Sequence, residues 1–251
     1  MREKISADML YNYIQCPHRL YLDLFENPGK RNKESAFLKL LWERGIDFEE
    51  EVMANLKKPF LDLSSYSGQE KETKTLEAIQ LGVPLIYSGR ISIENLVGEP
   101  DLLVKEEDGY IAGDIKSGSA LENENDESEG KLKKHYALQL NLYTDILEKL
   151  DFSSSKPPFI YDIKGRDVNY DLKQSKGKRE QTTWWEFYLQ TLEEVQEIME
   201  QRVTTTPAHA GVCKLCHWRT HCFKNLLKRN DLTLIPELGR KKRDIMLQQL
   251  N

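Results

Sequence analysis

The sequence predicts a mixed α/β (α+β) fold in which helices flank a central mixed sheet. Apolar residues in the first part of the chain recur at the spacing of helices. Between residues 85 and 116 this spacing gives way to the alternation that is typical of strands. Helical and strand-like segments then follow one another. This order of segments is typical of helices that cover a mixed sheet.

The N-terminal part of the chain is predicted to be helical. Ser6 is an N-cap candidate for a short first helix, whose apolar face carries Met9, Leu10, Tyr13 and Ile14. A second helix is expected over residues 18–25, a turn at 27–29 and a long helix over 34–57. The predicted buried stripe of the long helix consists of Phe37, Leu41, Phe48, Val52 and Leu56.

The central part supplies the strands of the predicted sheet. Asp108-Gly109 is a hairpin turn signal, and residues 117–130 form a polar loop. Strands are expected at residues 85–88, 90–95, 97–105, 110–116, 159–164 and 168–172, and helices at 132–150 and 184–202.

Four parts of the chain differ in composition. Residues 1–33 form a helical part with the first cysteine, and residues 34–205 form the core with the sheet. Residues 206–230 hold the other three cysteines, and residues 231–251 form a basic tail. The sheet is expected within the core alone, so the helical start and the cysteine segment lie outside it.

The charge of the chain is unevenly distributed. The net charge is −5, and residues 122–129 contain five acidic residues and no basic one. Residues 213–243 contain nine basic residues against two acidic ones. A basic end suits a polyanionic partner, although a solvated helix face would look the same. No apolar run approaches the roughly 20 residues of a membrane span, so we expect an intracellular, cytoplasmic protein without a membrane partner.

The predicted hairpin brings three charged side chains together. With a two-residue loop at Asp108-Gly109, Asp101 faces Lys116 and Leu103 faces Asp114. Directly paired residues point to the same side of a sheet, and side chains alternate along each strand. Asp101, Asp114 and Lys116 should therefore share one face, unless the loop has three residues.

Two carboxylates and an ammonium group on one face are suited to metal-dependent hydrolysis. Paired carboxylates hold Mg²⁺ or Mn²⁺ and leave room for water and a phosphate oxygen. A lysine can orient the attacking water and offset the charge that develops on the phosphate. The alternative is a cross-strand salt bridge, which the charge types alone favour.

Gly98-Glu99-Pro100-Asp101, followed by Asp114-Ile115-Lys116, resembles the signature of PD-(D/E)xK nucleases. Further on, Gln139 and Tyr143 resemble the QxxxY motif of the RecB-like branch of that superfamily. Their spacing of four places both on one side of a helix, where they could reach the same phosphate or the lysine. The resemblance implies a restriction-endonuclease-like core.

One element departs from the RecB-like pattern. These enzymes carry a histidine metal ligand in a Gly-x-x-His-Glu pattern ahead of the strands, and the matching residues 45–49 have Phe48 at the histidine position. Glu49 matches the glutamate of the pattern and is the candidate for a substitute carboxylate ligand. The alternative is that the acidic residues around it form a solvated helix face.

The four cysteines are unevenly spaced along the chain. Cys16 lies near the N-terminus, and Cys213, Cys216 and Cys222 form a group near the C-terminus. In an intracellular protein this set indicates metal binding rather than disulfides. Residues 16–21, Cys-Pro-His-Arg-Leu-Tyr, resemble the first cluster motif of iron–sulfur RecB-like nucleases.

The cysteine resemblance implies a [4Fe–4S] cluster that is held by all four thiolates and joins the N- and C-terminal parts in a helical clasp. Structural zinc is the alternative, because the later cysteines with His217 and His221 could form a local site without Cys16. Otherwise these histidines and His209 are ordinary surface or packing residues.

The tail resembles the start of a helix-hairpin-helix, a motif that offers backbone N–H groups to a DNA phosphate. Residues 234–243 carry the resemblance, and Glu237 stands where the first glycine is usual. We expect at most a supporting role in DNA binding. Tryptophans could also stack on unpaired bases, although core packing is the simpler role of Trp184, Trp185 and Trp218.

The resemblance implies a Mg²⁺- or Mn²⁺-dependent DNA nuclease, expected to be an exonuclease on single strands or frayed ends. Asp101, Asp114, Glu49 and the carbonyl of Ile115 would bind the metal, and Lys116 would position the water. Gln139 and Tyr143 would position the scissile strand. A helicase or CRISPR adaptation proteins are the implied partners. The alternatives are a catalytically weak or inactive DNA-binding scaffold subunit and a nuclease that acts on RNA.

Overall fold

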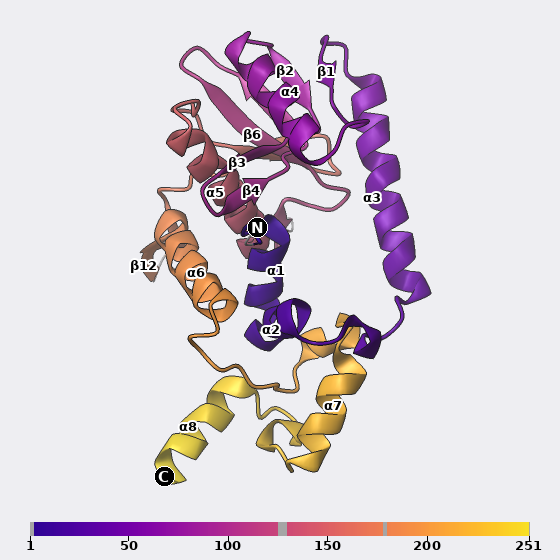
Figure 1. Ribbon diagram of the computed structural model, residues 1–251, viewed down its shortest axis with the longest axis vertical. Coiled ribbons are helices and arrows are strands. Elements are labelled where there is room, and N and C mark those ends of the chain that lie inside the picture. The colour runs from indigo at the N-terminus through magenta and orange to yellow at the C-terminus, as the bar shows by residue number, and fades with distance from the viewer. Residues whose placement is uncertain (1–2, 125–129, 178–179, 251) are drawn as a thin grey trace. The chain divides into compact units, whose positions relative to one another are not determined.

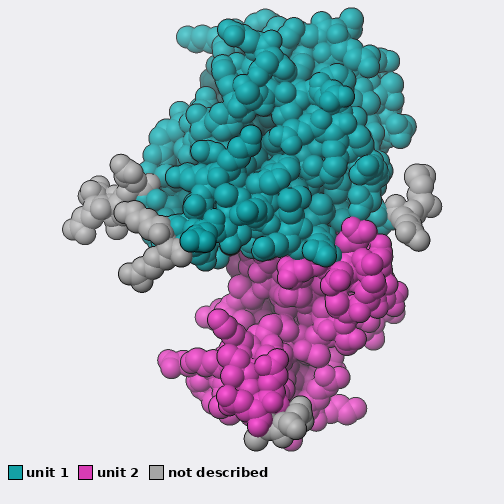
Figure 2. All heavy atoms as spheres, turned by 90° about the vertical axis from the view of Figure 1, so that its left-hand side faces the viewer, with its two compact units in different colours: residues 1–11, 42–193 teal, residues 12–41, 194–251 magenta. Residues whose placement is uncertain are grey.

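The computed structural model describes residues 3–124, 130–177 and 180–250 (Figure 1). The chain forms two compact units, which are coloured separately in Figure 2. The first unit consists of residues 1–11 and 42–193, and the second of residues 12–41 and 194–251. The acidic residues Asp126, Glu127 and Glu129 of the predicted polar loop lie outside the described residues.

The first unit contains a mixed sheet of six strands in the order β1-β2-β5-β6-β9-β10. β1 and β2 run parallel, as do β6 and β9, and the other neighbours are antiparallel. The strands are β1 (Leu61–Asp62), β2 (Leu85–Tyr87), β5 (Leu102–Lys105), β6 (Tyr110–Ile115), β9 (Phe159–Tyr161) and β10 (Asp167–Asn169). Three small ribbons pair β3 (Ile91–Ile93) with β4 (Leu96–Gly98), β7 (Leu121–Glu122) with β8 (Lys131–Leu132), and β11 (Ser175–Gly177) with β12 (Glu180–Thr183).

The predicted helices are present, with ends that differ by a few residues from the expected ones. Ser6 accepts a hydrogen bond from the backbone N–H of Met9 at 3.4 Å, which confirms the cap of α1. No helix in the described part of the chain is both long and apolar enough to cross a bilayer. The α-helices are α1 (Ala7–Gln15), α2 (Pro17–Phe25), α3 (Ala36–Asn55), α4 (Gly68–Gln80), α5 (Lys134–Lys149), α6 (Trp184–Met199), α7 (Arg219–Lys228) and α8 (Arg240–Leu250), and short 3₁₀ helices cover Pro28–Lys30, Gly211–Leu215 and Leu232–Leu234.

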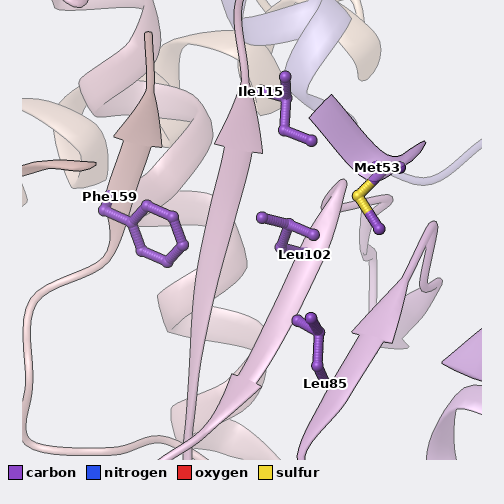
Figure 3. Packing of buried hydrophobic residues seen from close by; sticks show 5 residues of the cluster. All are labelled: Met53, Leu85, Leu102, Ile115 and Phe159. Atoms are coloured by element: carbon purple, nitrogen blue, oxygen red, sulfur yellow. The ribbon is translucent and has the colours of Figure 1, made fainter. Parts of the chain in front are cut away.

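The end of α3 packs on one face of the sheet. Met53 lies against a cluster of buried side chains from the strands (Figure 3). The predicted stripe of α3 is confirmed near its end but wrong at Phe37 and Leu41, which are 55% and 44% exposed. The reason is that burial on the sheet involves only the last turns of the helix. The strand residues of the cluster are Leu85, Leu102, Ile115 and Phe159, and Phe48 and Val52 of α3 pack around it together with Leu56, which follows the helix.

The opposite face of the sheet is covered by α5, which packs on β3, β4 and β6, while α4 packs on β3. Successive side chains of a strand point to opposite faces. Because Ile115 faces α3, its neighbours Asp114 and Lys116 point to the α5 side. The fold is thus the predicted mixed sheet with helices on both faces.

The hairpin differs from its predicted register by two residues. Leu102 pairs with Gly113 and Lys105 with Tyr110, so the loop consists of Glu107 and Asp108. Asp101 therefore lies opposite Asp114 rather than Lys116. The shift keeps the parity, and the three charged residues still share one face.

The physical reason for this register is that Asp108 and Gly109 have other roles. The Asp108 carboxylate accepts hydrogen bonds from the Ser154 hydroxyl and, at 2.9 Å, from the Ser155 backbone N–H. A side chain at Gly109 would come within 2.6 Å of the Ser153 backbone. Both residues are thus fixed by the chain that follows α5, which a turn signal cannot reveal.

Several other elements differ from the prediction. The expected strand over residues 97–105 is divided into β4 and β5, because residues 99–101 leave the ladder. The polar loop contains β7, which pairs with β8 directly after the loop. α4, β1 and the β11–β12 ribbon were not predicted, because their polar faces weaken their periodicity.

A side chain at Gly113 should destabilise the core. A Cβ atom there would lie 2.4 Å from Cζ of Phe159, whose ring fills the space above the glycine. Gly113→Ala should therefore lower the free energy of unfolding by about 1–3 kcal/mol, as measured by urea denaturation. Gly177→Ala is the control, because a Cβ at Gly177 meets nothing within 4 Å. Equal stability of the two variants would contradict this packing.

Candidate functional site

The two candidate carboxylates lie at the start of β5 and the end of β6. The backbone N–H of Asp101 donates to Oδ1 of Asp114 at 3.2 Å. The backbone N–H of Ile115 donates in return to Oδ2 of Asp101 at 2.8 Å. Each carboxylate is therefore anchored on the other strand, which fixes the pair without any further residue.

Lys116 completes the cluster. Its Nζ lies 3.0 Å from Oδ2 of Asp114 and 3.7 Å from Oδ2 of Asp101. The cross-strand salt bridge considered as an alternative is thus present, but it is not on an exposed face, because Asp114 is 0% exposed. Oδ2 of Asp114 has no hydrogen-bond partner of good geometry in the described part of the chain, although the ammonium is close.

Burial governs the electrostatics of the cluster. Burial and the neighbouring Asp114 carboxylate raise the pKa of Asp101 well above its ordinary value. Burial disfavours the charged form of Lys116, but the carboxylates of Asp114 and Asp101 outweigh this effect and raise its pKa. One ammonium therefore serves the buried carboxyl group of Asp114 and the partly buried one of Asp101, and a further cation would relieve their repulsion.

The residues present fit a hard divalent cation in donor type. No three His, Cys, Asp or Glu side chains of the described residues form a ready metal-binding group. The two carboxylates, one of them with an unsatisfied buried oxygen, still have the chemistry that Mg²⁺ and Mn²⁺ prefer. Any complete coordination shell would have to include backbone oxygen or water.

Glu49 and Phe48 lie differently on α3. Oε1 of Glu49 accepts a hydrogen bond from the Tyr87 hydroxyl at 2.9 Å, and its charge helps to raise the pKa of Asp101. The Phe48 ring packs on the core cluster, with its centroid 6.5 Å from that of Tyr161. The position of the family histidine is therefore used for packing, while Glu49 lies beside the site.

Gln139 and Tyr143 meet on α5 as the spacing predicted. Nε2 of Gln139 lies 2.8 Å from the Tyr143 hydroxyl, which donates to the carbonyl of Glu99 at 3.2 Å. Tyr143 is 2% exposed, and a Cβ at Gly98 would lie 2.5 Å from its ring. In this arrangement Tyr143 supports the segment that leads to Asp101. A contact of Gln139 or Tyr143 with DNA stays a prediction.

The second unit gathers all four cysteines around one cavity. Burial raises the pKa of Cys216, and burial together with the neighbouring thiols raises the pKa of Cys222 to about 12. The described cysteines do not have the arrangement of a ready metal site. Four converging thiols nevertheless match the donor set of an iron–sulfur cluster or zinc, which would replace their protons.

Asp23, which was not predicted as a functional residue, links the N-terminal helices to the cysteine segment. Its Oδ1 lies 2.6 Å from Nε2 of His217 and accepts from Nε1 of Trp218 at 2.9 Å. Arg31 donates to the same oxygen at 2.9 Å. An isolated aspartate on a helix gives no signal for such a role, because its partners are almost 200 residues away.

The other aromatic and histidine residues are mainly packing residues. Trp184 and Trp218 are buried, so the core-packing role is confirmed for them. Trp185 packs near Tyr188, with 5.6 Å between the ring centroids. Nε2 of His221 lies 3.7 Å from Glu26, and the His209 ring packs against Phe223.

The basic tail packs within the second unit. Arg243 is only 4% exposed and donates to the carbonyl of Pro207 at 2.7 Å. Arg240 donates to the carbonyl of Thr206 at 2.7 Å and to Sγ of Cys16 at 3.5 Å. Glu237 has a left-handed φ of 63°, a conformation that favours glycine. Part of the tail's charge therefore stabilises this unit rather than forming a free basic surface.

Comparison with known proteins gives one match. The sequence profile of the PD-(D/E)XK nuclease superfamily matches residues 15–223, which is well over half of the chain. The matched range includes Asp101, Asp114 and Lys116 and all four cysteines. The mixed sheet with flanking helices is consistent with the restriction-endonuclease-like fold of that superfamily. No curated protein matches the chain significantly.

Removing the Tyr143 hydroxyl should weaken the support of the Glu99 carbonyl. Tyr143→Phe loses the bonds to Gln139 and Glu99, and we expect the free energy of unfolding to fall by about 1–2 kcal/mol in urea denaturation. Tyr161→Phe is the control, because no hydrogen bond of its hydroxyl is seen among the described residues. A Tyr143→Phe variant as stable as the parent would mean that the hydroxyl does not hold the segment.

Proposed function

The chain belongs to the PD-(D/E)XK nuclease superfamily, and from this membership we propose that it is a metal-dependent nuclease that hydrolyses DNA. Its proposed catalytic residues are Asp101, Asp114 and Lys116. One observation carries the proposal. Two carboxylates share one lysine, and Oδ2 of the fully buried Asp114 has the Lys116 ammonium 3.0 Å away but no hydrogen bond of good geometry among the described residues. Such a pair has little value as a stabilising salt bridge, because both acids lose their hydration.

Each residue of the cluster has a proposed role. Asp101 and Asp114 would hold Mg²⁺ or Mn²⁺, with Glu49 and the carbonyl of Ile115 as further ligands. The cation, when bound, supplies Lewis acidity toward the phosphate and lowers the pKa of a bound water. Lys116 orients the attacking water and offsets negative charge on the phosphate. Gln139 and Tyr143 keep the Asp101 segment in place beside the scissile strand.

The mode of cleavage is proposed from the motif resemblance. The Gln139/Tyr143 pair of the RecB-like branch supports an exonuclease that acts on single strands or frayed ends, with a helicase or CRISPR adaptation proteins as partners. The core position of Phe48 supports a second candidate, a DNA-binding scaffold subunit with weak or no catalysis. Both candidates predict DNA binding, and catalysis separates them.

We expect the protein to degrade a labelled single-stranded oligonucleotide in the presence of Mn²⁺. Lys116→Ala should lower the rate by about 100-fold or more, because it removes the group that stabilises charge in the transition state. Lys131→Ala, an exposed lysine of the same unit, should keep the parent rate. Asp114→Asn should abolish cleavage in the presence of Mn²⁺, because it removes one of the two proposed carboxylate ligands.

Two further substrates define the activity. A circular single strand should resist an exonuclease, and an RNA oligonucleotide tests the RNA-directed alternative. No degradation at high protein concentration, or equal degradation by parent and Lys116→Ala, would exclude the enzyme and favour the scaffold.

We also propose that the cysteine cavity holds a [4Fe–4S] cluster ligated by Cys16, Cys213, Cys216 and Cys222. The supporting observation is that all four side chains line one cavity within the second unit. A local zinc site without Cys16 would need a histidine as its fourth ligand, but His217 is engaged by Asp23 and His221 lies beside Glu26. The cluster would join the N- and C-terminal segments of this unit.

Protein purified without oxygen should be brown and contain about four iron and four sulfide ions per chain. Cys16→Ser should lose most of the iron, because a cluster needs the distant cysteine, whereas a local zinc site does not. Ser35→Ala, a change outside the cavity, is the control. A colourless protein that contains zinc, with or without Cys16, would contradict the cluster.

A further inference from the structure

The segment that carries Asp101 is held by α4 as well as by Tyr143. The backbone N–H of Ser88, just after β2, donates to the carbonyl of Asp101 at 2.8 Å. Nζ of Lys71 on α4 donates to the Ser88 hydroxyl at 3.0 Å. A short chain of hydrogen bonds therefore runs from α4 through Ser88 to the candidate metal ligand.

Ser88 adopts an unusual backbone conformation. Its φ of 56° lies in the left-handed region, which costs a residue other than glycine free energy. Glycine would adopt this conformation without strain, but it would have no hydroxyl for Lys71. A strained backbone conformation therefore occurs at the residue whose N–H binds the Asp101 carbonyl. This indicates that the Ser88 hydroxyl is needed for its hydrogen bond with Lys71.

Lys71 is an unexpected residue for its surroundings. It is 7% exposed, and within the described residues its recorded partner is the Ser88 hydroxyl rather than a carboxylate. A buried ammonium group loses hydration, so an apolar side chain would serve better for packing alone. Lys71 therefore has a role that depends on its hydrogen bond.

The same helix holds the other side of Pro100. Glu72 of α4 lies 3.5 Å from the guanidinium of Arg90, which also contacts the Glu99 carboxylate. The backbone N–H of Arg90 donates to the Thr75 hydroxyl at 2.9 Å. α4 thus contacts, directly or through Arg90 and Ser88, the residues on both sides of Pro100, and its link to Asp101 runs through Ser88.

We propose that Lys71 is a positioning residue that acts through Ser88 to fix Asp101. With the Asp101 carbonyl held, its N–H stays on Asp114 and its carboxylate stays on the N–H of Ile115. The catalytic meaning of this role rests on the proposed nuclease function. The positioning itself concerns hydrogen bonds that exist without a metal.

Amide exchange in the metal-free protein, followed by NMR, tests the positioning directly. Lys71→Met and Ser88→Gly should each speed exchange at the amides of Asp101 and Ile115 by about tenfold. Lys71→Arg, which keeps a donor, should restore part of the protection. Lys74→Met is the matched control on α4, and its exchange should equal that of the parent protein.

Ser88→Gly separates positioning from general stability. It relieves the left-handed strain and keeps the backbone N–H, so its melting temperature should equal or exceed that of the parent. If the Asp101 amide exchanges faster in a variant with an unchanged or higher melting temperature, a loss of global stability cannot be the cause. Should Lys71→Met fail to fold, Ser88→Gly alone decides the question.

Binding of Mn²⁺ alone, measured by calorimetry, links the positioning to the site. We expect Lys71→Met and Ser88→Gly to bind Mn²⁺ about tenfold more weakly than the parent, with Lys74→Met unchanged. Unchanged amide exchange in both variants would overturn the proposal. If exchange responds but the parent neither binds Mn²⁺ nor cleaves DNA, the nuclease function fails and the positioning role stands.

Discussion

Two carboxyl groups, those of Asp101 and Asp114, must lie side by side on a buried face of the sheet, and the rest of the first unit depends on this constraint. Burial and mutual repulsion oppose the charged forms, as the raised pKa of Asp101 shows. The structure offsets this cost with Lys116 and with backbone N–H donors from the opposing strand. The two carboxyl groups are therefore held side by side by groups of the protein itself.

The short segment between β4 and β5, residues 99–101, connects this pair of carboxyl groups to the surrounding helices. On the α5 side, Tyr143 packs on Gly98 and binds the carbonyl of Glu99. On the α4 side, Ser88 binds the carbonyl of Asp101. The segment leaves the β ladder and is held by the Tyr143 hydroxyl and the backbone N–H of Ser88. This explains why one predicted strand is two strands in the structure.

The second unit also brings ionisable groups together, in this case the thiols of four cysteines. Its N-terminal helices and C-terminal segment are joined by Asp23, which accepts hydrogen bonds from residues far away in sequence. Four cysteines converge on one cavity, and burial keeps the thiols of Cys216 and Cys222 protonated. In both units polar groups from different parts of the chain are brought together by the protein's own hydrogen bonds.

The sequence by itself determined the order of most helices and strands, the shared face of Asp101, Asp114 and Lys116, and the pairing of Gln139 with Tyr143. These features follow from local periodicity and from the parity of a two-residue loop, which a register shift of two leaves unchanged. Only the tertiary structure decided the register itself, the exposure of Phe37 and Leu41, and the roles of Asp23 and Lys71. Each of these depends on contacts between residues that are distant in sequence or that have no periodic pattern, so no local signal could encode them.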